Sequence, residues 1–145
     1  PSTGYVGGFS AAEVTALHDH MASDYATWAN GFSRLAMRNP EQPELADSFA
    51  SSLKALRPDL ATAILTTAFR SDCRAEALQY GRLGLPTLLL QTMNDVAVPA
   101  AAAEWLAQAT GGKLHMLAIE GHFPHIVAPE IVSQQILDFV DRYAT

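Results

Sequence analysis

Two residues of this sequence, an aspartate and a histidine, each follow an apolar run that has the character of a buried strand. Asp95 stands in TMNDVAVP directly after PTLLLQ, and His122 stands in EGHFPHIV directly after KLHMLAI. In open α/β sheets, functional groups gather just beyond the carboxyl ends of the strands. If the two strands are neighbours, the acid and the imidazole meet at one edge. Such a pair is the orienting part of a Ser-His-Asp triad, in which the carboxylate fixes the tautomer of the base.

Other interpretations of the same residues stay open at this point. Asp95 also suits an Asx turn before a proline, and His122 also suits a solvated loop. His125 follows a proline and is expected to be structural, facing the final helix. A metal site built on the two histidines would need a third ligand at ordered spacing, and the sequence shows none. We therefore expect neither a metal nor any other cofactor.

The nucleophile that a triad needs has no counterpart in the sequence. A hydrolase of this class carries its serine in G-x-S-x-G, on a tight turn between a strand and a helix. The nearest strings are GFSAA at residues 8–12 and GFSRL at residues 31–35. Ser10 is explained as a helix cap and Ser33 falls inside a predicted helix. The order acid then base fits the α/β-hydrolase order, so we expect the serine to lie in a segment before residue 1.

Composition limits the classes of partner. The chain has 145 residues, 49% of them hydrophobic and 17% charged, with a net charge of −6. One soluble domain with a small hydrophobic ligand fits these values, whereas nucleic acid and anionic membranes need clustered Lys and Arg. The single cysteine, Cys73, excludes an internal disulfide and is compatible with a cytoplasmic protein. The opening PSTGYVGGFS, which lacks Met, predicts that the chain begins inside a longer protein.

Periodicity predicts helices first and alternating strands and helices afterwards. Ser10 and Glu13 form an S-x-x-E capping box at the start of the first helix. The second helix should bury one face, which carries Trp28, Phe32, Leu35 and Ala36. The apolar runs indicate parallel strands with helical crossovers, hence an α/β fold, and two strands alone leave unpaired edges. The first helix is expected to begin near residue 11. Further helices are expected at 25–37, 44–55, 59–70, 100–109 and 131–143, and strands at 86–91 and 113–119.

Six motifs, in order along nearly the whole chain, resemble the C-terminal half of the RsbQ-type α/β-hydrolases. That family includes a bacterial stress-regulator hydrolase and the plant strigolactone and karrikin receptors. The motifs are YVGGF (5–9), TWANGF (27–32), LRPDLA (56–61), AFRSDCR (68–74), LQTMNDVAVPA (90–100) and EGHFPHIVAPE (120–130).

The resemblance implies a domain plan and roles for individual residues. It implies a leading loop at 1–8, a four-helix lid at 9–76 and the last two strands and helices of an α/β-hydrolase core at 77–145. Asp95 matches the triad acid, His122 the triad base and His125 a histidine outside the triad. Three features depart from the family. They are the long linker ALQYGRLGLP (77–86), Ala97, where the plant receptors have serine, and the absence of the half with the first strands, the oxyanion loop and the serine, which is expected before residue 1. The positions that match substrate-binding sites are Trp28, Phe32, Phe69 and Val96.

Two functions are compatible with the resemblance, and a third interpretation is a degenerate stand-alone domain with an unrelated use. The first is a serine hydrolase that cleaves a small apolar ester or lactone, completed by the missing N-terminal half. The second is a ligand-sensing receptor module with slow hydrolysis, in which the lid binds a signalling protein. Both would use the same pocket, so the sequence alone does not separate them.

Overall fold

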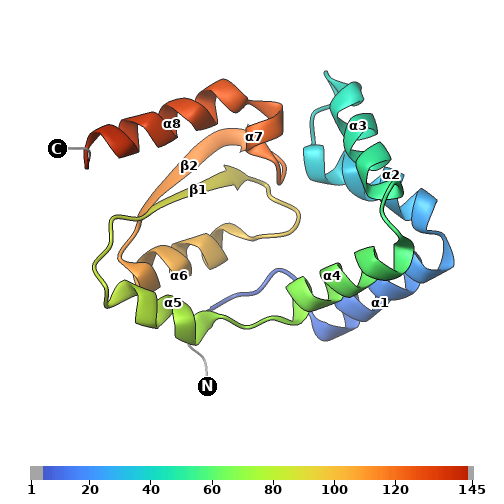
Figure 1. The fold of residues 1–145 in the computed structure, drawn as a ribbon, viewed down its shortest axis with the longest axis horizontal. Coiled ribbons are helices and arrows are strands. Elements are labelled where there is room, and N and C mark those ends of the chain that lie inside the picture. Colours follow the sequence, from blue (N-terminus) through green and yellow to red (C-terminus); the bar gives the residue numbers. More distant parts are fainter. Residues whose placement is uncertain (1–4, 144–145) are drawn as a thin grey trace. The chain divides into compact units, whose positions relative to one another are not determined.

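The computed structural model of the chain describes residues 5–143, which form two compact units (Figure 1). The core unit comprises residues 5–8 and 73–143, and the helical unit comprises residues 9–72. The chain leaves the core unit after Gly8 and returns to it at Cys73, so the helical unit is an insertion. The family resemblance implied that this unit ends at residue 76. Helix α5 (Arg74–Gly81) belongs to the core unit instead.

Four helices build the helical unit, as the sequence predicted. They are α1 (Ala11–Ser23), α2 (Tyr25–Met37), α3 (Pro43–Lys54) and α4 (Pro58–Arg70). The capping box of α1 is present: the Glu13 N–H donates to Ser10 Oγ at 3.3 Å, and the Ser10 N–H donates to Glu13 Oε2 at 2.7 Å. The bond from the Ser10 backbone lowers the pKa of the Glu13 carboxyl. Local sequence thus determines where this helix begins.

Small residues, an aromatic cluster and the methionines Met21 and Met37 form the interior of the helical unit. Alanine and serine side chains let the helices approach closely. A hydrogen bond also joins α2 to α3, because Tyr25 Oη donates to the Leu53 carbonyl at 2.8 Å. The Trp28 ring stacks between Tyr25 and Phe32, with centroids 5.6 Å and 5.1 Å away. The buried small residues of α2 and α3 are Ala29, Ser33, Ala36, Ala46 and Ala50.

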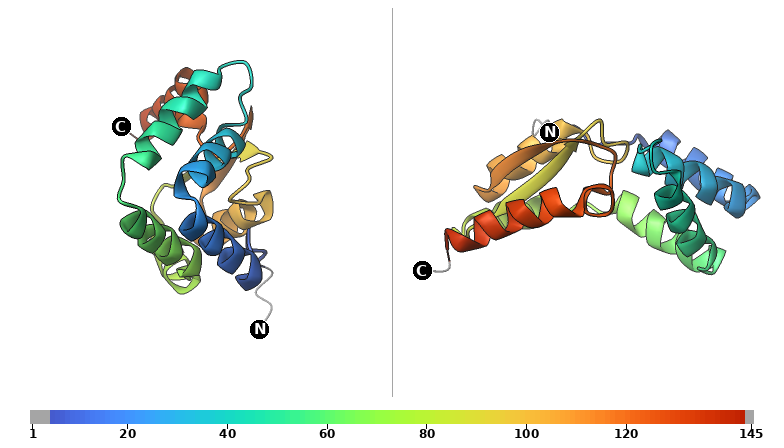
Figure 2. Two further views of the ribbon diagram at one scale, coloured as in Figure 1. Left: turned by 90° about the vertical axis from the view of Figure 1, so that its right-hand side faces the viewer. Right: turned by 90° about the horizontal axis from the view of Figure 1, so that it is seen from above.

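The core unit is a three-layer arrangement around two parallel strands. Strand β1 (Leu88–Met93) pairs with β2 (Lys113–Glu120), connected through α6 (Ala100–Thr110). Helix α6 lies on one face of the strands, and α8 (Pro129–Asp141) lies on the other (Figures 1 and 2). A single-turn helix, α7 (Pro124–Val127), joins β2 to α8. The crossover places the carboxyl ends of both strands at the same edge.

The structure departs from the predicted elements at several places, including the start of β1 and the linker before it. Strand β1 begins at Leu88 rather than at residue 86, because Pro86 has no N–H to donate to a ladder. Part of the predicted linker 77–86 is helical, since α5 extends to Gly81. A β-carbon on Gly81 would overlap the Ala109 carbonyl oxygen, so this glycine permits the close approach of α5 and α6.

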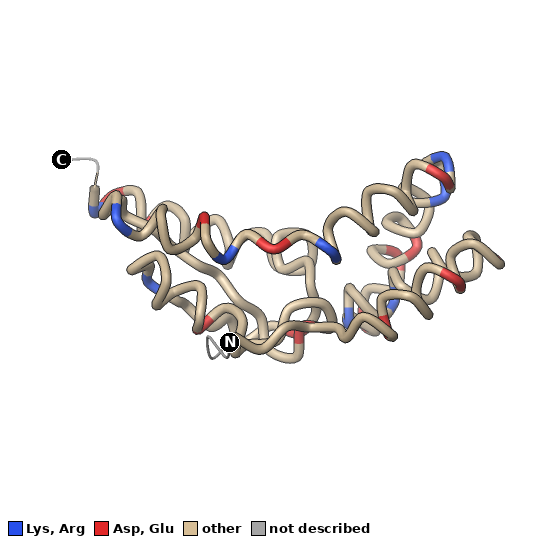
Figure 3. Tube along the Cα trace, turned by 90° about the horizontal axis from the view of Figure 1, so that it is seen from below, with Lys and Arg blue, Asp and Glu red and all other residues tan. Residues whose placement is uncertain are grey.

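Lys and Arg do not gather into a basic cluster along the described chain. Lys and Arg positions are spread over both units (Figure 3). Across residues 5–143, every helix is too short or too polar to span a bilayer. The exclusion of nucleic acid and membrane as partners stays a prediction from composition.

Candidate active site

The structure brings Asp95 and His122 into direct contact at the carboxyl ends of β1 and β2. His122 Nδ1 lies 3.0 Å from Asp95 Oδ1 and 3.0 Å from Asp95 Oδ2. With Nδ1 as the donor, the tautomer leaves Nε2 as the acceptor. A base that takes a proton on Nε2 while a carboxylate holds Nδ1 is the geometry that the sequence predicted.

A turn of the acid loop, residues 94–99, orients the carboxylate. Asp95 Oδ1 accepts hydrogen bonds from the Ala97 N–H at 2.8 Å and from the Val98 N–H at 3.1 Å. Asp95 is therefore an Asx-turn residue and also the partner of His122. The two interpretations of this residue describe one arrangement, because the turn holds the carboxylate in place for the imidazole.

The two side chains differ in their exposure to solvent. The Asp95 side chain is 7% exposed, whereas that of His122 is 30% exposed. Nε2 of His122 has no hydrogen-bond partner within residues 5–143 and is free to meet a reacting group. Gly121, with φ of 90°, precedes it in a conformation that disfavours side-chain-bearing residues.

His125 lies apart from this pair. It is exposed on α7, and its ring meets Phe123 edge-on with centroids 5.9 Å apart. No cluster of three His, Cys, Asp or Glu side chains suited to a metal ion occurs in the described part of the chain. Of the two histidines, His122 is the one with an acidic partner.

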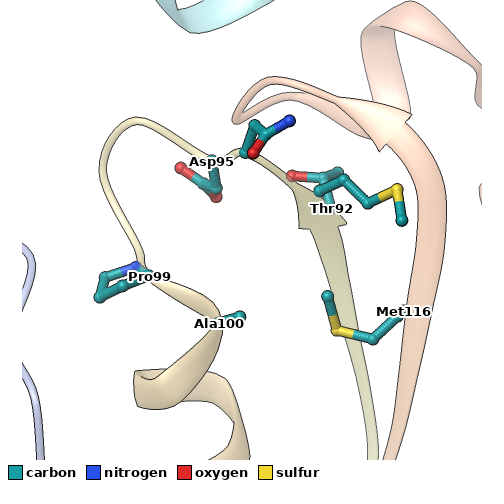
Figure 4. A pocket seen from close by; sticks show the side chains of 7 residues that line it. Thr92, Asp95, Pro99, Ala100 and Met116 are labelled. Atoms are coloured by element: carbon teal, nitrogen blue, oxygen red, sulfur yellow. The ribbon is translucent and has the colours of Figure 1, made fainter.

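A shallow pocket of about 380 Å³ lies between the end of β1, the acid loop and the start of α6 (Figure 4). Asp95, Pro99 and Ala100 line one side, and Met116 of β2 lines another. His122 is not among the lining residues, so this hollow reaches the acid and not the base.

The three predicted aromatic substrate contacts lie in the helical unit in two separate clusters. Trp28 is 3% exposed and stacks on Phe32, so it belongs to the core of that unit. Phe69 meets Phe9 edge-on, with centroids 5.1 Å apart. Val96, in the core unit, follows Asp95 in the acid loop and is partly buried. Their contact with a ligand stays a prediction.

Sequence reasoning missed the polar side chains that support the two loops. The buried Gln91 donates from Nε2 to the Val98 carbonyl at 3.1 Å, and the buried Thr92 donates from Oγ1 to the Gly121 carbonyl. Asn94 Nδ2 also donates to Glu120 Oε1 at 3.1 Å. A signal was present, because polar residues that end an apolar strand must find partners when buried.

Gly8 lies against the acid loop and predicts a sharp steric effect. A β-carbon on Gly8 would overlap the Ala97 carbonyl oxygen, whereas on Gly7 it would meet only the Tyr5 ring, at 3.6 Å. We expect Gly8→Ala to lower the stability of the full-length protein by about 1 to 3 kcal/mol, as overpacking does. The difference in urea-denaturation midpoint checks it, with Gly7→Ala as the matched control. Equal midpoints for the two variants would contradict the close approach.

Comparison with known proteins shows what this chain is similar to. No family model matches the chain. It is 34% identical over 134 residues to a strigolactone esterase of Pisum sativum. The matched region covers 91% of this chain and 49% of that protein. It is 32% identical over 135 residues to a karrikin insensitive 2 receptor of Petunia hybrida, covering 92% and 49%. It is 33% identical over 128 residues to a pimeloyl-[acyl-carrier protein] methyl ester esterase of Nitrosomonas europaea, covering 85% and 50%.

A solved structure shows the same fold. A hydrolase from Oleispira antarctica superposes with a TM-score of 0.85 at 23% identity, over 97% of this chain and 51% of that one. The parallel strands, the helices on both faces and this likeness define part of an α/β-hydrolase fold. The chain belongs to the α/β-hydrolases and is similar to the strigolactone esterases and karrikin receptors among them. It spans about half the length of the curated relatives it matches.

Proposed function

We propose that this chain supplies the acid and the base of a serine hydrolase that cleaves a small apolar ester or lactone in the cytoplasm. The observation that carries the proposal is the contact of His122 Nδ1 with both oxygens of a buried Asp95, at 3.0 Å, with Nε2 left free. The serine and the oxyanion-hole donors come from residues outside this chain. Below, "full-length protein" means the protein that carries all of these parts.

The proposed reaction has two halves. Nε2 of His122 takes the proton of the serine hydroxyl as its oxygen attacks the ester carbonyl carbon. The same proton passes to the leaving alkoxide, and the acyl group stays on the serine. Water then attacks the acyl-serine, loses its proton to Nε2, and releases the acid while the serine is reprotonated. Asp95 stabilises the imidazolium formed in each half.

The apolar character of the substrate is inferred from the helical unit. Two of its aromatic side chains, Phe32 and Phe69, match pocket positions of the resembled family and are only partly buried, and such rings supply large apolar contact areas. Val96, next to the acid, would add an aliphatic contact. A neutral ligand also suits a chain of net charge −6 better than an anionic one.

A second candidate function is a ligand-sensing receptor with slow hydrolysis, whose helical unit binds a signalling protein. One of the relatives is named a receptor, and α4 exposes two large aliphatic residues one turn apart, Leu60 at 50% and Ile64 at 62%. Steady multiple turnover without a partner favours the enzyme. A single turnover that changes the protease sensitivity of the helical unit favours the receptor.

The function is tested by replacing the acid in the full-length protein. We expect Asp95→Asn to lower the kcat for a p-nitrophenyl ester by about 10⁴-fold, because the amide stabilises the wrong imidazole tautomer. Asp141→Asn, on the exposed end of α8, is the control and should leave kcat unchanged. Similar rates for the two variants would exclude the proposed hydrolase mechanism.

A further inference from the structure

Thr92, one residue before the end of strand β1, carries a buried hydroxyl that reaches the base loop, residues 121–123. Thr92 is 3% exposed, and its Oγ1 donates a hydrogen bond to the carbonyl oxygen of Gly121, the residue directly before His122. Figure 4 shows Thr92 at the tip of β1. A hydrogen bond in this buried position is stronger than one that competes with water, and losing its donor leaves a buried carbonyl unsatisfied.

The regular register of the backbone ladder is interrupted next to this bond. Regular pairing runs from Leu88 with Lys113 to Thr92 with Leu117, and the next partners are Met93 and Glu120. The register shift means that regular pairing no longer determines the position of Gly121. A glycine also restrains its own backbone less than any other residue. The side chain of Thr92 therefore fixes the point from which His122 extends.

The acid loop has separate supports. Gln91 Nε2 holds the Val98 carbonyl at 3.1 Å, and the turn bonds of Asp95 involve only residues of its own loop. The bond between Asn94 and Glu120 crosses from one loop to the other but is exposed, so water competes with it. Among these bonds, the one from Thr92 is the buried link between β1 and the base loop.

We propose that Thr92 is a positioning residue, which holds the base loop through Gly121 so that the His122 imidazole stays aligned with Asp95 and with the reacting serine. The inference rests on the proposed function, because it assigns Thr92 a part in proton transfer. A misplacement of a catalytic group by about 1 Å costs on the order of 10²-fold in rate. Loss of the hydroxyl should therefore lower kcat while leaving substrate binding intact.

The test uses four variants of the full-length protein. Thr92→Val removes the donor and keeps the shape, and Thr92→Ser keeps the donor. Thr110→Val is the matched control: Thr110 is 7% exposed in the same unit and donates to the Leu106 carbonyl at 2.7 Å, within α6. We expect Thr92→Val to lower kcat by about 10- to 100-fold with KM unchanged, and Thr92→Ser to restore it to within about threefold. Thr92→Ala against Thr92→Ser gives a second comparison in case the valine variant does not fold.

A spectroscopic readout separates this inference from the proposed function. The proton on His122 Nδ1, bound to a carboxylate, should give a downfield NMR resonance that His122→Ala removes and Thr92→Val shifts or broadens. Unchanged ester hydrolysis in His122→Ala overturns the proposed hydrolase. The Nδ1 resonance of the protein that keeps His122 still reports whether Thr92 positions the imidazole. A Thr92→Val variant that matches Thr110→Val in both kcat and the resonance overturns the positioning role, and so does a serine variant as slow as the alanine one.

Discussion

Replacement of His122 by alanine in the full-length protein is expected to lower kcat for ester hydrolysis by about 10⁴- to 10⁶-fold. The residual rate would come from binding and oxyanion stabilisation, which do not need the base. The imidazole edge is 30% exposed, so its loss leaves little cavity and the fold should persist. Steady-state rates with a p-nitrophenyl ester, together with a circular dichroism spectrum, measure both expectations.

His125→Ala is the matched control for this experiment. His125 lies three residues further along the chain, is exposed, and contacts Phe123 rather than a carboxylate. We expect its removal to change kcat by less than about twofold, as for most exposed substitutions. If His125→Ala were the slower variant, the assignment of the base within EGHFPHIV would be reversed.

The position of the acid and base could be predicted because it depends on topology more than on detail. Parallel strands joined by a helical crossover end at the same edge, so Asp95 and His122 meet once β1 and β2 are neighbours. The start of α1 could also be predicted, because the capping box of Ser10 and Glu13 is a local interaction.

Features that depend on tertiary packing could not be predicted from the sequence in this way. Leu35 was expected on the buried face of α2 but is 55% exposed. Trp28 and Ala36 are buried as expected, but the buried face of α2 also carries Ala29 and Ser33. Such small residues give a weak hydrophobic signal even where helices pack closest. The link from Thr92 to Gly121 depends on a register shift between two strands, which no local pattern encodes.

The two-stranded sheet leaves large apolar surfaces uncovered. Within residues 5–143 the sheet consists of β1 and β2 alone. Large apolar side chains are exposed on the strands and on α8, including Met93 at 52%, Met116 at 42% and Val140 at 50%. Apolar strands of a parallel sheet are normally covered on both faces and flanked by further strands. We therefore expect another polypeptide to complete the sheet and to bring the serine with it.

Mixing this 145-residue chain with the polypeptide that precedes it in the full-length protein should generate esterase activity that neither part has alone. An acid and a base without a nucleophile have no covalent pathway, so the gain should be at least about 10³-fold over either part. The control carries His122→Ala in this chain: it should still bind the other part, because the imidazole edge is partly exposed, but should restore no activity. Binding is followed by size-exclusion chromatography and activity with a p-nitrophenyl ester. Ester hydrolysis by this chain alone, at a rate that His122→Ala does not alter, would show that the Asp95 and His122 pair is not the catalytic machinery.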